Sequence, residues 1–223
     1  MRIVLVGVFS LLLISCSEFF SEDVSDSLIT INSPSDSLFT QSGEITFWWE
    51  EDRGMENYRF QLVSPSFYNP DFIFDTLMAV NEIRLELAQG VHSWRLRAEN
   101  AVSESAWFQR FLVVDTLPPL APVLISPAEN DTIDLQAESL TFNWQSLDVA
   151  INGFSFPTRD SVFIYMDDHL LYSAQATPPF TLVKADSMLG VRAEATQLDW
   201  EIRATDQAGN REVSIRIPFF LTP

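Results

Sequence analysis

The side chains that most often carry out catalysis are scarce in this sequence. It contains two histidines, His92 and His169, one lysine, Lys184, and one cysteine, Cys16. A Ser-His-Asp site needs a histidine that a carboxylate orients, and the pair Asp168-His169 falls in an expected hairpin turn, where both side chains are solvated. The sequence has no glycine-rich phosphate loop and no histidine-based metal spacing. We therefore expect a protein that is not an enzyme and that uses no cofactor.

Oxygen ligands for a metal ion are more plentiful. Asp206, Asn210 and Glu212 surround an expected tight turn, and Ca²⁺ prefers carboxylate and amide oxygens. Asp206 and Asn210 are also residues that shape a turn by themselves, with Gly209 supplying a positive φ. Because no Asp-x-Asp-x-Asp loop occurs, the sequence favours the turn-shaping role and predicts no metal site. It leaves open whether a calcium ion lies near Asp206.

Aromatic side chains are the other candidate ligand surface. Trp48 and Trp107 are expected to be at least partly exposed, and such indoles stack on sugar rings or anchor protein partners. Either indole can instead pack on the stem of a neighbouring arginine. The apolar run 149–157, which contains Phe154 and Phe156, either folds back over the end of a domain or forms a binding patch. These four aromatic residues are the candidate ligand-binding residues.

Alternation of apolar and polar residues predicts the β-strands that would position these side chains. The inward positions of four such segments are Ile45, Phe47 and Trp49; Trp94, Leu96 and Ala98; Leu140, Phe142 and Trp144; and Leu198, Trp200, Ile202 and Ala204. A period of two is typical of strands that bury one face in an antiparallel sandwich. Turns are expected at Ser64-Pro65, Asn69-Pro70, Gln89-Gly90, Asp167-Asp168 and 208–210.

Three blocks of sequence recur in the same order, which indicates two copies of one module. INSP at 31–34 returns as ISP at 125–127, ITFWW at 45–49 as LTFNW at 140–144, and WRLRAEN at 94–100 as WEIRATD at 200–206. Between the copies, DTLPPLAP at 115–122 is rich in proline, which favours a stiff, extended connection. We expect an all-β chain with one β-sandwich domain at 28–116, a linker at 117–122 and a second sandwich at 123–223.

These blocks resemble fibronectin type III domains and related bacterial immunoglobulin-like domains. The run ATDQAGN at 204–210 is similar to a turn found in extracellular bacterial immunoglobulin-like repeats. The resemblance implies two consecutive antiparallel sandwiches. In such domains a tyrosine usually stands six residues before the alanine of this strand; here that position is His92 in the first copy and Leu198 in the second, so the hydrogen bond of a tyrosine corner is in doubt in both.

The first residues predict export. One positive charge at Arg2 precedes an apolar run of about a dozen residues, which is typical of a secretory signal and too short to span a bilayer. The sequence LISC at 13–16 resembles the processing motif of bacterial lipoproteins, which implies a signal peptide at 1–15 and lipidation of Cys16. An ordinary cleavable signal is the alternative. The polar, acidic segment 16–27 is expected to be a flexible tether.

Net charge and composition limit the functions that the chain can have. The chain has a formal net charge of −18, and removal of residues 1–15 takes away one arginine, so the mature charge is −18 − 1 = −19. Such a surface disfavours nucleic acid. We expect an envelope protein that is anchored through its N-terminal lipid, most simply to the outer membrane on its periplasmic or outer side. It would be a binding or spacer module for an unidentified envelope protein or glycan; the alternative is an accessory glycan-binding lipoprotein of a polysaccharide uptake system.

Overall fold

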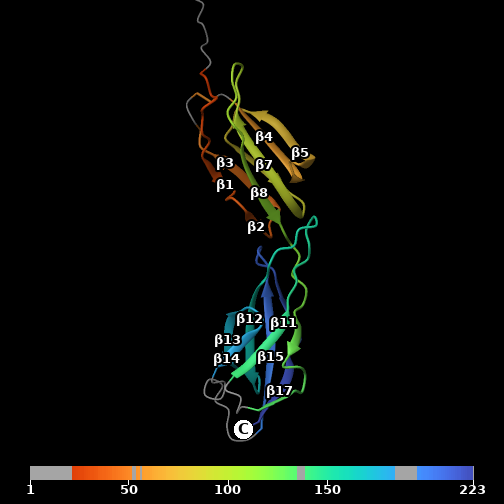
Figure 1. Cartoon of the computed structure of the whole chain (residues 1–223). Helices are drawn as coiled ribbons and strands as arrows, with labels where there is room; N and C mark the ends of the chain where they lie inside the picture. Colours follow the sequence, from red (N-terminus) through yellow and green to blue (C-terminus); the bar gives the residue numbers. More distant parts are fainter. Residues whose placement is uncertain (1–21, 52–53, 56, 135–138, 184–194, 223) are drawn as a thin grey trace, which may run out of the picture.

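The computed structural model describes residues 22–51, 54–55, 57–134, 139–183 and 195–222. Every regular element in these residues is a β-strand. None of them forms a helix with the length and apolarity needed to cross a membrane. The strands form two sandwiches that follow one another along the chain (Figure 1). Cys16 and Lys184 lie outside the described residues.

The first domain packs a three-stranded sheet, β1-β3-β6, on a five-stranded sheet, β2-β8-β7-β4-β5 (Figure 1). Its strands are β1 (Ile31–Ser33), β2 (Leu38–Thr40), β3 (Glu44–Trp49), β4 (Tyr58–Ser66), β5 (Asn69–Met78), β6 (Glu82–Glu86), β7 (Gly90–Ala98) and β8 (Phe108–Val114). All neighbouring strands are antiparallel except β2 and β8. Along the chain, the strands pass back and forth between the two sheets, as in a fibronectin type III-like sandwich.

The second domain repeats this arrangement, with sheets β14-β11-β9 and β10-β17-β15-β12-β13, and with β16 also paired to β15. Its strands are β9 (Val123–Ser126), β10 (Thr132–Asp134), β11 (Ser139–Gln145), β12 (Arg159–Met166), β13 (His169–Ala176), β14 (Phe180–Val183), β15 (Thr196–Thr205), β16 (Arg211–Val213) and β17 (Ile217–Thr222). The repeated blocks occupy equivalent strands: β3 matches β11, and β7 matches β15. The prediction of two sandwich domains is confirmed.

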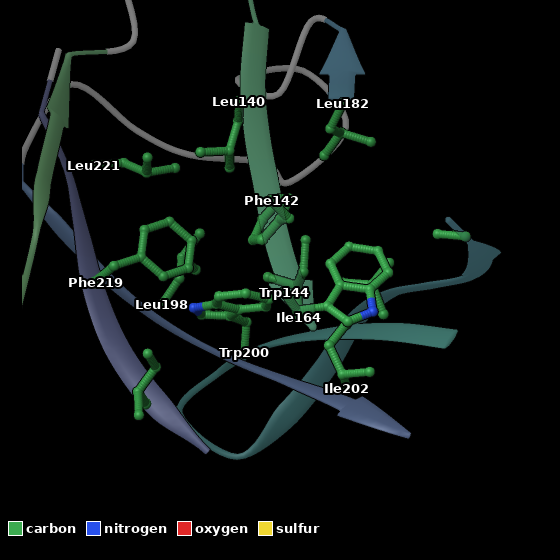
Figure 2. Close-up of a cluster of buried hydrophobic side chains, with 13 residues drawn as sticks. Leu140, Phe142, Trp144, Ile164, Leu182, Leu198, Trp200, Ile202, Phe219 and Leu221 are labelled. Carbon is green, nitrogen blue, oxygen red and sulfur yellow. The ribbon is translucent and has the colours of Figure 1, made fainter. Parts of the chain in front are cut away.

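The period of two places the cores where the sequence predicts them. In the first domain, Phe47 and Trp49 are fully buried, and Trp94 packs edge-on against Phe47 with ring centroids 5.1 Å apart. In the second, Phe142 lies 5.0 Å from Trp200, and both are fully buried. Figure 2 shows the second core, with residues from β11, β15 and β17 pointing toward one another. Burial of one side-chain face per strand is what holds each pair of sheets together.

Two of the predicted turns are wrong. Ser64-Pro65 lies inside β4 and Asn69-Pro70 begins β5, while the turn between them falls at Phe67 and Tyr68. Proline is tolerated at position 65 because the pairing of β4 with β7 ends earlier, at Val63, so no partner on that side requires an N–H. The turn at Asp167-Asp168 is confirmed, with φ values of 47° and 64° in a two-residue hairpin.

His92 takes over the role of the missing corner tyrosine in the first domain. Its ring is buried, and Nε2 lies 2.9 Å from the carbonyl oxygen of Ala88, four residues back along the chain. This contact requires the tautomer that carries its proton on Nε2. Burial lowers the pKa of His92 from its usual value. His92 therefore supplies from this position a hydrogen bond to the backbone, the kind of bond that the sequence left in doubt.

The chain just before β1 is packed on the first domain. Val24 is buried, its backbone N–H donates to Ser103 Oγ at 2.8 Å, and Asn100 Nδ2 donates to the carbonyl of Glu22 at 2.7 Å. These residues belong to the segment 16–27 that is expected to be a flexible tether. Residues 22–27 thus extend the first domain, because Val24 offers an apolar side chain that the domain covers.

Candidate cation site at the domain junction

The first domain ends at a carboxylate. Strand β8 runs directly into Asp115, whose backbone N–H donates to the carbonyl of Thr40 at 2.8 Å. Its side-chain oxygen Oδ1 accepts the N–H of Leu117 at 3.1 Å, at the start of the linker. The Asp115 side chain is buried at this point. The last residue of the sandwich is therefore held in place by its own domain and by the linker.

The apolar loop of the second domain lies against the first domain. Ile151 is buried with Val91 and Val113, and Phe156 meets Phe39 edge-on at 4.8 Å. In addition, Asn152 Oδ1 accepts the backbone N–H of Val91 at 2.8 Å. The sequence left open whether this loop covers its own domain or forms a binding patch. The loop instead places Ile151 and, in part, Phe156 in the contact between the two domains, whereas Phe154 stays exposed.

A tight turn after β15 brings in a second carboxylate. Asp206 is fully buried, and its Oδ1 accepts the N–H groups of Gly209 at 2.7 Å and Asn210 at 2.9 Å. Gly209 has a φ of +95°, which a residue with a side chain rarely adopts. The turn-shaping role predicted for Asp206 and Asn210 is confirmed. Asn210 Nδ2 also donates to the carbonyl of Asp115 at 2.9 Å, which joins this turn to the end of the first domain.

Asp148, from the start of the apolar loop, completes a group of three carboxylates. One oxygen from each of Asp115, Asp148 and Asp206 lies within 4.8 Å of the others, and all three side chains are buried. Asp148 Oδ1 accepts the N–H of Val149, but among the described residues the second oxygen of neither Asp115 nor Asp148 accepts a hydrogen bond. No described lysine or arginine forms an ion pair with any of the three.

The electrostatics of this group disfavour three negative charges. Burial raises the pKa of Asp115 above its usual value, and the charge of Asp206 adds to the effect. Burial likewise raises the pKa of Asp148, with further contributions from Asp115 and Asp206. Buried carboxylates without a counter-charge are costly. A bound cation would remove that cost, and two oxygens on one Ca²⁺ can lie up to about 5 Å apart, twice the Ca–O distance.

The sequence identified only one of these three residues as a possible calcium ligand. Glu212, considered with Asp206, does not belong to the group; its Oε1 accepts the N–H of Val213. Asp115 and Asp148 were missed, because they stand 33 residues apart, and Asp148 stands 58 residues before Asp206. The only local signal was the position of Asp115 beside the proline-rich linker.

The candidate aromatic residues lie in different surroundings. Trp48 is 45% exposed on the outer face of β3, opposite Glu82 of β6. Trp107 is covered by two guanidinium groups, with Arg95 4.1 Å and Arg97 4.6 Å from the ring centroid. Phe154 is exposed, and Phe156 belongs to the domain contact. The structure therefore does not bring the four together into one surface.

The described histidines do not meet catalytic partners. His92 contacts the backbone of Ala88, and Nδ1 of His169 contacts the carbonyl of Asp167 at 2.8 Å in the exposed hairpin turn. In the described part of the chain, neither ring forms hydrogen bonds to both a carboxylate and a serine hydroxyl, as a catalytic triad requires.

Comparison with known proteins found matches among solved structures only, at low sequence identity. No family model and no curated protein matches the chain. Among solved structures, the fibronectin(III)-like modules of CbhA from Clostridium thermocellum share 13% identity over 87% of this chain and 93% of theirs, with a TM-score of 0.39. A two-domain fibronectin type III segment of chicken tenascin shares 16% over 88% and 98%, with a TM-score of 0.31. Three N-terminal domains of the bacteriophage RB49 outer capsid protein Hoc share 11% over 87% and 70%, with a TM-score of 0.46. Because these TM-scores stay below 0.5, the description of the chain as two fibronectin type III-like sandwiches in tandem rests on its sheet topology.

Proposed function

We propose that this chain is a non-catalytic, lipid-anchored spacer of the cell envelope, whose two domains are fixed to one another by a divalent cation at their junction. The observation that carries the proposal is the convergence of Asp115, Asp148 and Asp206, three buried carboxylates from both sides of the junction. The signal sequence and the motif LISC at 13–16 support the anchor and an outer-membrane address.

The spacer role follows from the way the junction is built. A proline-rich connection limits bending, and the contact of the apolar loop with Val91 and Val113 limits rotation. The three carboxylates oppose this closed arrangement through their mutual repulsion, and a cation turns the repulsion into attraction. Calcium fits better than magnesium, because it accepts irregular sets of six to eight oxygens. With calcium bound, the domains would keep a fixed orientation and hold a partner at a set distance from the membrane.

The test is a calcium titration of the purified full chain, followed by thermal unfolding and by small-angle scattering. Calcium at 100 times its Kd should stabilise the native state by about 2.7 kcal/mol and narrow the distribution of molecular dimensions. Asp148→Asn should abolish both effects, whereas Asp71→Asn, at an exposed aspartate of β5, should leave them unchanged. A wild-type protein that unfolds identically in calcium and in EDTA would contradict the cation site.

We expect the two fixed domains to bind a partner, which is a protein or a glycan of the envelope. Incubation of the protein with envelope extract, followed by identification of what it retains, would name a protein partner. The alternative role in polysaccharide uptake rests on the aromatic candidates, of which Trp48 offers exposed surface. A glycan array would test it: binding that survives Trp48→Ala unchanged would remove Trp48 as the ligand residue.

A further inference from the structure

The second domain carries a polar cleft of about 230 Å³ that uses none of the junction carboxylates. Its lining residues are Arg159, Ser161, Gln175, Thr205 and Arg211. The strand register explains why they meet, because Arg159 of β12 pairs with Thr205 of β15, which pairs with Arg211 of β16. Ser161 and Gln175 form the neighbouring pair between β12 and β13. The cleft thus contains two guanidinium groups, two hydroxyls and an amide, and no carboxylate.

Arg159 and Arg211 differ from every other described arginine of the chain. Each of the others forms an ion pair, a hydrogen bond or a ring contact, whereas these two form none with described residues. Glu201, four residues before Thr205 on β15, is bound by Arg203 at 2.8 Å and by Arg216 at 3.2 Å. In a chain of net charge −18, two unpaired arginines at one cleft repel each other and leave their donors free for an external oxyanion.

A larger cleft of about 710 Å³ adjoins the first and shares Arg159 and Gln175 with it. Apart from one carboxylate, the rest of its wall combines apolar residues with hydroxyls: Pro157, Ala176, Pro178, Pro179 and Phe180 with Ser146, Thr158, Thr177 and Thr181. Its one carboxylate, Asp160, is buried and accepts Trp144 Nε1 at 2.7 Å. Apolar rings beside hydroxyls and an amide suit a pyranose, which has apolar C–H faces and a hydroxyl rim.

We propose that the two clefts together bind a sugar acid. Its carboxylate lies between Arg159 and Arg211, and its ring lies along Pro179 and Phe180. The acidic remainder of the surface repels long polyanions, so the preferred ligand is a short oligosaccharide with one or two uronic acids. This site goes beyond the proposed spacer role and depends on none of its residues.

The test is isothermal titration of the full chain, at fixed ionic strength and in saturating calcium, with digalacturonate, the neutral galactose disaccharide and inorganic sulfate. Digalacturonate should bind, and the neutral disaccharide should bind roughly tenfold or more weakly, because it lacks the charge-assisted hydrogen bonds. Arg159→Gln and Arg211→Gln should each weaken digalacturonate binding by a similar factor, roughly tenfold or more, because each removes one of the two guanidinium groups. Arg84→Gln, which removes an equal charge at an exposed ion pair of the first domain, should not.

Three results would overturn the proposal: no binding of digalacturonate, equal binding of the neutral disaccharide, or full binding by both arginine variants. Sulfate that binds as tightly as digalacturonate would show a bare oxyanion site and would also reject the sugar acid. Repeating the titration in EDTA separates this site from the junction. If digalacturonate still binds in EDTA, the sugar-acid site holds whether or not the junction binds calcium. If Arg159→Gln still binds calcium, the calcium site holds whether or not the clefts bind a sugar acid.

Discussion

Trp48 and Trp49 are adjacent in the sequence and lie on opposite faces of β3. Trp49 is fully buried against Tyr58, with ring centroids 5.3 Å apart, whereas Trp48 points outward. Trp144 holds the place equivalent to Trp49 in the second domain, and its indole N–H also donates to the buried carboxylate of Asp160. The alternation of the sequence predicted all three positions, because a strand places successive side chains on opposite faces.

Substitution of these tryptophans should separate the faces. Trp49→Ala and Trp144→Ala should each lower the free energy of unfolding by about 3–5 kcal/mol, as for other large aromatic truncations. Trp144→Ala should be the more damaging, because it leaves the Asp160 carboxylate without a donor. Trp48→Ala should cost much less. Denaturant unfolding of the three variants measures these differences, and a larger loss for Trp48→Ala than for Trp49→Ala would refute the register of β3.

At the scale of elements, the loop between β11 and β12 contributes to both features of the domain junction. It supplies Ile151 to the contact between the domains and Asp148 to the carboxylate group. Its apolar composition was visible in the sequence, but its neighbour was not, because composition shows that a segment will be buried and not which surface covers it. Burial raises the pKa of Asp148, so the contribution of this loop to the stability of the native protein depends on pH.

The raised pKa predicts how Asp148→Asn changes stability with pH. In EDTA, the native protein retains the Asp148 proton to a higher pH than the unfolded chain does, so wild-type stability falls as the pH rises above the ordinary aspartate value of 3.8. Asp148→Asn lacks this loss and should become progressively more stable than wild type over that range. In saturating calcium the order should reverse near neutral pH. Thermal midpoints measured from about pH 3, below the ordinary aspartate pKa, to about pH 8 in both conditions check the prediction.

At the scale of the whole molecule, the chain is a rod of two sandwiches with an acidic surface and a predicted lipid at one end. Figure 1 shows the domains end to end, with the first described residues of the chain, in red, on the side of the first domain away from the second. An anchor at Cys16 would therefore place the second domain, with its arginine cleft, farther from the membrane. This arrangement suits a module that presents a binding surface at a distance.

Cys16→Ser tests the anchor. Without the thiol no acyl chain can attach, so the protein should leave the membrane fraction or accumulate as an uncleaved precursor. Fractionation with immunoblotting, together with mass analysis of the mature N-terminus, provides the measurement. Wild-type protein that is recovered in the aqueous phase without detergent would contradict lipidation.

The sequence by itself determined the features that depend on local geometry. The period of two decided which face of β3, β7, β11 and β15 is buried, and the repeated blocks decided that there are two domains, because any antiparallel sheet imposes the same alternation on its strands. Only the tertiary structure decided what lies between the domains and across neighbouring strands. Asp115, Asp148 and Asp206 come from three distant segments, and Arg159 meets Arg211 only through the pairing of β12, β15 and β16. No local period encodes such meetings, because they follow from how whole sheets and whole domains are placed against one another.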